Sequence, residues 1–351
     1  MVTKDVLYKL VVFLATVGIA VGLVPIMTIV ERRVAAFIQN RWGPNRVGPW
    51  GLLQPVADGI KAFFKEEFVP ARADRLLHFI APMLVFVPPA IGFAVIPWGN
   101  QIGSVKLQAV NLNIGVLFMM SVLSIAVYGL AIGGWASNNK WSLLGGLRAS
   151  AQLISYELTL GLAILVAIMM AESVDPQVIV AKQTRGILSW NVFGGGNLLA
   201  LPCGLLGILL LYTAALAENN RLPFDLPECE QELVGGYHTE YSSMKFAMFF
   251  MGEYVAMVNM SAIVTMLYLG GWYFPGITNP ADHSWLGGIL SVGVFMAKTF
   301  AILFVYVWIR WTFPRFKYNQ LMNLGWKGLL PLSLANVALL AVVGVFTGGK
   351  P

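Results

Sequence analysis

Long apolar runs separated by short polar segments recur from one end of the chain to the other. Each run has roughly 18 residues or more, which is long enough for a helix to cross the hydrocarbon layer of a membrane. Eight spans are predicted, at roughly 6–30, 76–98, 111–134, 149–172, 198–217, 244–270, 286–311 and 326–347. The predicted fold is therefore all-α, a polytopic transmembrane helix bundle in which residues 1–351 form a single integral membrane domain.

The first polar connection, residues 31–75, contains an amphipathic stretch. Between residues 50 and 67, Leu, Val, Ile and Phe recur at helical spacing on one face, and Asp58 and Lys61 lie on the opposite face. A charged helix of about 18 residues lies along a membrane interface instead of crossing it. An ordinary surface helix has the same pattern. The spacing of Asp58 and Lys61 is that of a weak surface ion pair.

Composition and charge place the polar segments on the two sides of a membrane. The chain is 58% hydrophobic and 11% charged, which is typical of a membrane protein. Sixteen of its 23 Lys and Arg residues fall on one side of the predicted spans, six on the other, and Lys298 lies inside a span. The positive-inside rule puts the larger group in the cytoplasm, with the acidic segment 217–243 and the basic segment 312–326. Both termini are then periplasmic.

The apolar N-terminal run has the flanking lysines of a signal peptide. It is longer than a signal peptide needs and is followed by charged residues, so we expect it to be retained as the first span. The net charge of +6 comes from cations beside the spans, which indicates lipid contact and no nucleic-acid partner. The cations of segment 312–326 fit lipid head groups or an acidic surface on a partner.

The acidic segment 217–243 holds six of the chain's 17 carboxylates: Glu218, Asp225, Glu228, Glu230, Glu232 and Glu240. Only Arg221 offsets them, and apolar residues such as Phe224 alternate with them. Crowded like charges beside apolar side chains favour the protonated form of a carboxyl. The segment therefore indicates a site for protons or a neutral polar ligand. A plain solvated connector is the alternative interpretation.

Three ionisable residues lie within the predicted spans: Glu157, Glu253 and Lys298. A charge at such a depth costs at least about 2.5–3.5 kcal/mol on insertion scales, and such residues face a bundle interior or a water-filled cavity. Tyr156 and Tyr254 adjoin the two glutamates, and a phenol is a hydrogen-bond partner for a carboxyl. The pattern favours a proton path or ion site over a buried pair that only joins helices.

The sequence has no signature of a redox cofactor or metal of its own. Its two cysteines and three histidines are far apart, and neither a Rossmann nor a P-loop fingerprint is present. If the protein serves a redox reaction, the sequence predicts that other chains hold the cofactors.

Several motifs resemble those of one family. ERRVAAFIQNRWGPNRVGPWGLLQPVADGIKAFFKE (31–66), AENNRLPFDLPECEQELVGGYHTEY (217–241), PRFKYNQLMNLGWK (314–327), SYEL and GEYV occur in the order of its signature regions. The family is the quinone-site membrane subunit of proton-pumping NADH:quinone oxidoreductase, respiratory complex I, which is the H subunit in bacteria and subunit 1 in mitochondria. Two positions depart from its pattern. ECEQE replaces EGESE and keeps the acids, whereas KYNQ replaces RYDQ, so Asn319 carries no charge and receives no proton role.

The resemblance implies roles for named residues. Candidates to line the quinone chamber are Glu31, Arg32, Arg41, Asp58, Lys61 and Phe224. Candidates for a coupling loop are Arg221, Asp225, Glu228, Glu230 and Glu232. The proton path would consist of Glu157, Glu218, Glu240, Glu253 and Lys298, with Tyr156 and Tyr254. No metal site is implied.

The resemblance also implies the cofactors and partners. Quinone, expected to be ubiquinone, is the substrate, while FMN and iron–sulfur clusters belong to partner subunits. Partners are the peripheral iron–sulfur and quinone-pocket subunits, the small membrane subunits and the antiporter-like subunits. The expected location is the bacterial inner membrane, with the mitochondrial inner membrane as the alternative. Alternative functions are a subunit of a membrane-bound hydrogenase-type complex, a stand-alone ion-coupled transporter and a passive anchor.

Overall fold

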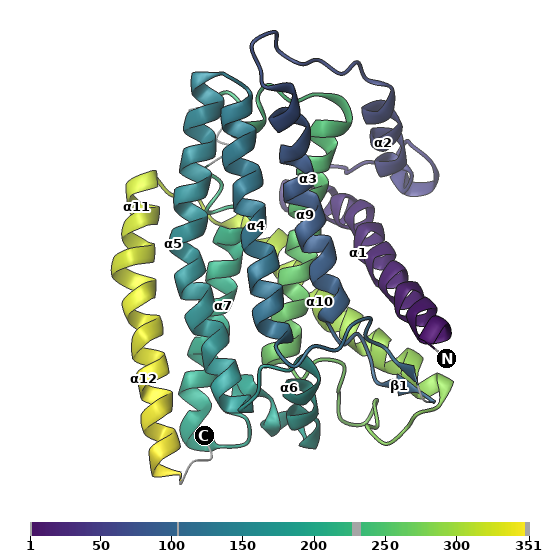
Figure 1. Cartoon of the computed structure of the whole chain (residues 1–351), viewed down its shortest axis with the longest axis vertical. Coiled ribbons are helices and arrows are strands. Elements are labelled where there is room, and N and C mark those ends of the chain that lie inside the picture. The colour runs from purple at the N-terminus through teal and green to yellow at the C-terminus, as the bar shows by residue number, and fades with distance from the viewer. Residues whose placement is uncertain (1, 104, 227–232, 348–351) are drawn as a thin grey trace.

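The computed structural model describes residues 2–103, 105–226 and 233–347. Within them, eight helical segments are long and apolar enough to cross a membrane, which confirms the predicted all-α polytopic bundle (Figure 1). Seven of these segments contain α1 (Val2–Ile38), α3 (Arg75–Gly92), α4 (Gly115–Ala136), α5 (Lys140–Ala171), α7 (Leu201–Glu218), α9 (Ser243–Tyr268) and α10 (Trp285–Thr312). The eighth joins α11 (Tyr318–Asn323), the π-helical turn η8 (Leu324–Leu329) and α12 (Leu330–Phe346).

Shorter elements occupy the connections. The helices α2 (Gln54–Phe64) and α6 (Pro176–Lys182) lie at opposite ends of the bundle (Figure 1). Single 3-10 turns are η1 (Pro49–Gly51), η2 (Phe93–Val95), η3 (Gln183–Arg185), η4 (Ile187–Ser189), η5 (Asn191–Phe193), η6 (Leu198–Ala200) and η7 (Gly236–His238). The strands β1 (Gln101–Ile102) and β2 (Val105–Lys106) pair antiparallel, with Gln101 opposite Lys106.

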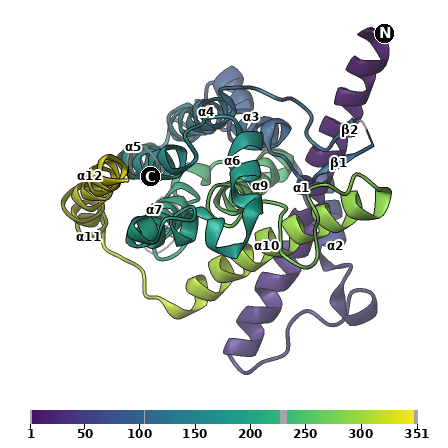
Figure 2. The same cartoon turned by 90° about the horizontal axis from the view of Figure 1, so that it is seen from below.

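The helix α9 forms the centre of the bundle. It contacts α1, α3, α7 and α10, and 72% of its most apolar window is buried, against 22–28% for the outer spans α1, α10 and the α11–α12 segment. Its sequence explains this position, because apolar and small residues occur all round it and such a helix is stable only inside a bundle. Seen from below, α1 and α12 lie at opposite edges of the molecule (Figure 2).

The first span continues past its predicted end at residue 30 and reaches Ile38. No Gly or Pro occurs between Pro25 and Gly43, and the buried Ala35 and Ala36 favour continued helix. Glu31 and Arg32 therefore lie on a helix and not in a connection. Successive residues on a helix point about 100° apart, so these two side chains face different neighbours.

The predicted interfacial helix 50–67 is shorter in the structure, where α2 runs from Gln54 to Phe64. Pro55 occupies its first turn, where the missing N–H costs nothing. Before it, Gly51 has φ +74°, and a Cβ there would lie 2.1 Å from the Pro44 carbonyl oxygen, so only glycine fits this turn. The apolar face of α2 stays open, since Ile60, Phe63 and other large side chains are more than half exposed.

Two other connections are shorter than predicted. The helix α5 begins at Lys140 instead of residue 149, because the Asn139 side chain accepts from the backbone N–H of Trp141 at 3.0 Å and caps it. The helical segment after α10 begins at Tyr318, which leaves only 313–317 of the basic segment outside helices.

Candidate functional site

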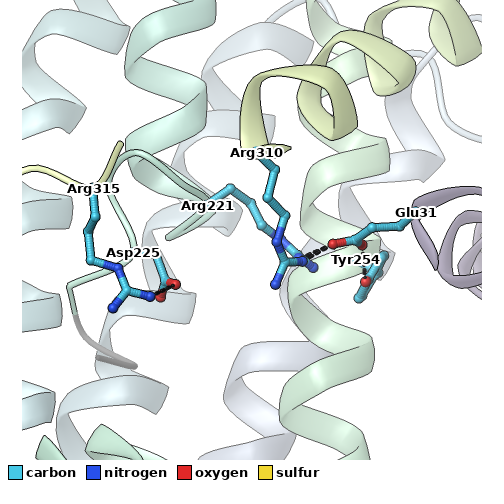
Figure 3. A network of polar contacts seen from close by, with 6 residues as sticks. All are labelled: Glu31, Arg221, Asp225, Tyr254, Arg310 and Arg315. Carbon is cyan, nitrogen blue, oxygen red and sulfur yellow. Dashed lines mark hydrogen bonds and ion pairs between the residues drawn. The ribbon is translucent and has the colours of Figure 1, made fainter. Parts of the chain in front are cut away.

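A buried carboxylate organises the polar centre at the α2 end of the bundle. Glu31 of α1 accepts hydrogen bonds from the Tyr254 hydroxyl of α9 and from the Arg310 guanidinium of α10 (Figure 3). The guanidinium of Arg221 lies 3.7 Å from the same carboxylate and 4.3 Å from the centre of the Tyr254 ring. Three spans and the segment after α7 therefore meet at one side chain, which we call the Glu31 cluster (Glu31, Arg221, Tyr254 and Arg310).

The Glu31 cluster carries an excess of positive charge. Glu31 and Arg221 have side chains only 8% exposed, and Arg310 is 30% exposed. A second pair, Asp225 with Arg315 at 2.9 Å, lies beside it (Figure 3). Among the described residues, three guanidinium groups thus face two carboxylates, for a formal charge of +1. Such a site suits a ligand whose oxygens accept hydrogen bonds and gain negative charge during a reaction.

The first part of the acidic segment is fixed at several points. Besides the Asp225–Arg315 pair, the backbone N–H of Phe316 donates to the Pro223 carbonyl at 3.2 Å. The buried Gln152 of α5 donates its side-chain N–H groups to the carbonyls of Ala217 and Phe224, each at 2.9 Å. The segment 219–226 is therefore held against α5 and the connection after α10.

A second polar centre surrounds a small cavity on the other side of α9. The cavity has a volume of about 40 Å³, and Glu218, Asn219, Asn220 and Glu253 line it together with apolar residues of α3, α4, α5 and α9. A water molecule needs roughly 10–15 Å³ measured in this way, so the cavity has room for about two or three. The Tyr237 hydroxyl donates to Glu253 Oε1 at 2.7 Å. Two of the predicted path carboxylates therefore line one cavity that has room for water.

Glu157 continues this group of carboxylates towards α4. It lies close enough to Glu218 for their charges to interact, and it accepts a hydrogen bond from the Ser124 hydroxyl. Glu218 Oε2 is buried without a hydrogen-bond partner among the described residues. Burying an acceptor in this state is costly, which is typical of a group that exchanges protons or binds water.

Glu240 lies away from the cavity, near the first turn of α5. Its carboxylate accepts from the Asn139 side chain at 2.6 Å. The next residue, Tyr241, stacks on His78 with ring centres 4.0 Å apart. Burial raises the pKa of the Tyr241 phenol above its usual range, so the phenol stays protonated at neutral pH. Glu240 therefore lies beside this aromatic pair and is bonded to the residue that caps α5.

The structure separates the residues predicted for a chamber. Arg32 pairs with Asp58 of α2 at 2.8 Å, and Asp58 also accepts from Gln54, so the expected Asp58–Lys61 pair does not form. Arg41 is exposed and donates to Gln39, and Lys61 is exposed on α2. Only Glu31 of the six lies in the charged cluster; Phe224 is buried between Tyr156 and Phe316 in the apolar core.

The prediction that Tyr156 bonds Glu157 and that Tyr254 bonds Glu253 is wrong. The Tyr156 hydroxyl donates to the Leu321 carbonyl at 2.9 Å, away from Glu157. Tyr254 bonds Glu31 instead of its neighbour Glu253, because adjacent residues on a helix point in different directions. The phenol on Glu253 is that of Tyr237, which sequence adjacency could not reveal.

Cations in and just before the basic segment form ion pairs within the chain. Arg315 of this segment is expected to meet lipid head groups or a partner, but it pairs with Asp225, and Arg310, just before the segment, pairs with Glu31. Lys298 lies apart from the carboxylates and donates to main-chain carbonyls after α9. The predicted loop acids Glu228, Glu230 and Glu232 lie outside the described residues. No group of three or more potential metal ligands occurs within the described ranges.

Four functional candidates were missed by sequence reasoning: Ser124, Tyr237, Arg310 and Arg315. Each contacts a predicted carboxylate from a distant part of the chain. A buried charge needs a partner, so the sequence predicts that each buried carboxylate has one. The sequence does not identify which residue that partner is.

Comparison with known proteins places the chain in one family. The family model described as NADH dehydrogenase matches residues 9–341. The chain is 46% identical over 328 residues to an NADH-quinone oxidoreductase H subunit of Koribacter versatilis, covering 89% of this chain and 90% of the relative. It is 48% identical over 325 residues to "NADH-quinone oxidoreductase subunit 8" of Rhodothermus marinus, covering 90% and 91%. A third relative, the NADH-quinone oxidoreductase H subunit of Rickettsia canadensis, is 44% identical over 345 residues, covering 97% and 96%.

Proposed function

Because the chain belongs to the NADH dehydrogenase family, as a membrane subunit of the same type as the H subunits of NADH-quinone oxidoreductase, we propose that it frames a quinone chamber and couples quinone reduction to proton movement. The Glu31 cluster is the proposed chamber end, and the cavity lined by Glu218 and Glu253 is the proposed start of the proton path. The names of the relatives favour this function over the hydrogenase-type complex, the transporter and the anchor.

One observation carries the proposal: two pairs of sequence neighbours connect the two centres. Tyr254 belongs to the Glu31 cluster, and its neighbour Glu253 lines the cavity. Arg221 belongs to the Glu31 cluster, and its neighbour Asn220 lines the cavity. The helix α9 and the residues after α7 therefore form the wall between the centres. A change of charge or position on one side of this wall acts directly on the other.

The Glu31 cluster has the chemistry that quinone reduction needs. A quinone takes up two electrons and two protons to become a quinol, and negative charge develops on its oxygens before they are protonated. Arg221 and Arg310 offer N–H groups and positive charge for these oxygens, and the Tyr254 hydroxyl is a nearby donor. Electrons would come from FMN and iron–sulfur clusters held by the peripheral partner subunits.

The distance between the centres permits electrostatic coupling. A helix with its side chains is about 10–12 Å across, so a charge that appears at the Glu31 cluster lies roughly that far from Glu253. At about 10 Å and an effective dielectric constant of about 20, a unit charge is worth about 1.7 kcal/mol. This changes a protonation equilibrium more than tenfold. Glu157 and Glu218 would then pass the change on towards the small and antiporter-like membrane subunits.

Glu218 offers a test of the path. We expect Glu218→Gln to lower the number of protons pumped per NADH at least threefold, because the amide cannot exchange a proton. The same change should leave the assembled complex about equally heat-stable, because glutamine has the size of glutamate and its amide can still hydrogen-bond water in the cavity. Pumping is measured by dye quenching in proteoliposomes, and stability by the temperature at which the complex loses assembly. Undiminished pumping would contradict the proton path.

The entrance for the quinone tail is proposed between α1 and α2. These helices contact each other and are joined by the Arg32–Asp58 pair. Ile60 and Phe63 of α2 are 54% and 67% exposed, as expected for a face in contact with lipid or a lipid-like tail. On this proposal α2 lies at the cytoplasmic surface of a bacterial inner membrane, and both termini are periplasmic.

A variant of α2 should distinguish long-tailed from short-tailed quinones. Replacing Ile60 and Phe63 together with Ser should raise the KM for a long-tailed ubiquinone several-fold, because apolar contact with the tail is lost. The KM for a tail-less quinone should change less than twofold. Steady-state NADH oxidation with both acceptors measures this, and Lys65→Gln beyond the end of α2 is the control. Equal effects on both acceptors would contradict the entrance.

A further inference from the structure

Lys298, in the middle of α10, is held by a ring of main-chain acceptors. Its ammonium donates to the carbonyls of Leu269 at 2.5 Å, Tyr273 at 2.7 Å and Gly271 at 3.1 Å. The Trp190 ring centre lies 4.2 Å away on another side. Among the described residues no carboxylate pairs with Lys298, although it lies within a membrane-spanning helix.

The three carbonyls favour the charged form of the side chain. An ammonium has three N–H donors and no acceptor, so it satisfies all three oxygens. A neutral amine would turn its lone pair towards one of them. The ring electrons of Trp190 and the negative end of the α9 dipole also favour a cation at this place. These contacts therefore favour the charged form of Lys298.

This site closes the C-terminal end of α9. The last carbonyls of a helix lack partners within it, and here side chains from three other elements supply them. Gln183 donates to Met266 at 3.1 Å, Asn191 to Leu267 at 2.7 Å, and Lys298 to Leu269. The carbonyls of Met266, Leu267 and Leu269 therefore all accept hydrogen bonds from side chains of other elements.

Two glycines beside Lys298 allow the side chains of Trp190 and Val180 to approach the backbone closely. Gly270 has φ +72°, and a Cβ there would lie 2.4 Å from the Trp190 indole nitrogen. Gly271 has φ +52°, and its Cβ would lie 2.7 Å from Val180. Both positions need glycine for conformation and for space. The ring of carbonyls around Lys298 is therefore a built site.

The site lies on the same central helix as the proposed proton path. Leu269 follows Glu253 by 16 residues, about 24 Å along α9. Between them, Asn259 and Thr265 are fully buried polar residues, and Asn259 Oδ1 has no partner among the described residues. Buried polar side chains thus occur along α9 between the cavity and Lys298, on different faces of the helix.

We propose that Lys298 is an electrostatic barrier that keeps protons in the buried polar path from escaping at the α6 end of the bundle. A fixed cation in a low-dielectric interior repels a proton or any other cation that approaches along α9. The three carbonyls are acceptors only, so none of them can pass a proton on. This inference rests on the proposed function, because it assumes that the cavity end of α9 carries protons.

The test is the passive proton conductance of the assembled complex in liposomes, without NADH. A potassium diffusion potential drives protons inward, and an entrapped pH dye reports their entry. We expect Lys298→Met to raise the conductance at least tenfold, Lys298→Gln to do the same, and Lys298→Arg to stay within about twofold of the unmodified complex. Lys182→Met removes an exposed lysine near the same end of the bundle and is the matched control.

Other outcomes overturn the barrier. An unchanged conductance in both neutral variants means that the charge blocks nothing. An equal rise in Lys298→Arg and Lys298→Met, accompanied by chloride leakage, means that a hole has opened and that Lys298 only holds the fold. The measurement uses no NADH, so it is separate from the test of the proposed function by Glu218→Gln. Adding Glu253→Gln to Lys298→Met should reduce the leak if the leak follows the path along α9.

Discussion

Replacing Glu31 with Gln should lower quinone-dependent NADH oxidation at least about tenfold. The substitution leaves Arg221 and Arg310 without the carboxylate that both contact, and removing one partner of a buried ion pair costs about 3–5 kcal/mol. A loss of only 1.4 kcal/mol in transition-state binding already gives a tenfold lower rate. NADH oxidation by a water-soluble artificial acceptor should stay unchanged, because that reaction needs only the peripheral subunits.

Two comparisons separate a lost site from a lost fold. In the double variant Glu31→Gln/Arg310→Gln one positive and one negative charge are removed together, so assembly should recover while quinone activity stays low. Glu172→Gln removes a carboxylate from an exposed pair with Lys182 and should change neither property, because exposed pairs contribute only about 0–1 kcal/mol. Full quinone activity in Glu31→Gln would rule out the Glu31 cluster as part of the chamber.

The membrane-spanning helices could be predicted from the sequence because the bilayer fixes their length and composition. An apolar run of twenty residues has few alternatives in a membrane, so all eight spans were found. Their ends follow less directly from composition, since a helix continues until a capping or breaking residue stops it. The polar residues after Val30 suggested an end, but the neighbours of Glu31 in space allow α1 to continue to Ile38.

The functional residues could be predicted individually but not as groups. Inserting a charge into a membrane is costly, and this cost alone identifies Glu157 and Glu253 as functional candidates, whatever their neighbours are. Whether Glu253 faces Tyr254 or Tyr237 depends on helix rotation and on packing against distant segments. For the same reason Lys298 was grouped with the carboxylates, although its nearest neighbours are carbonyls about 24 Å along α9 from Glu253. Sequence patterns do not contain this information.

Replacing Glu253 with Gln should reduce proton pumping per NADH at least fivefold in proteoliposomes. Glutamine has the size of glutamate and still accepts the hydrogen bond from Tyr237, so the cavity should keep its shape. It cannot bind and release a proton, so water in the cavity would no longer connect Glu253 to Glu218. The change is therefore chemical and not steric, and the heat stability of the complex should stay within a few degrees of the unmodified value.

The Tyr237 partner provides the graded comparison for this prediction. Tyr237→Phe removes only the hydroxyl that donates to Glu253 and should lower pumping about two- to threefold, since the carboxylate itself remains. Asp282→Asn, in the exposed connection after α9, keeps a side-chain oxygen for the Ser284 N–H and should leave pumping unchanged. If Glu253→Gln pumped normally while Tyr237→Phe did not, the phenol and not the carboxylate would be the proton carrier. The path would then run through η7 instead of through the cavity.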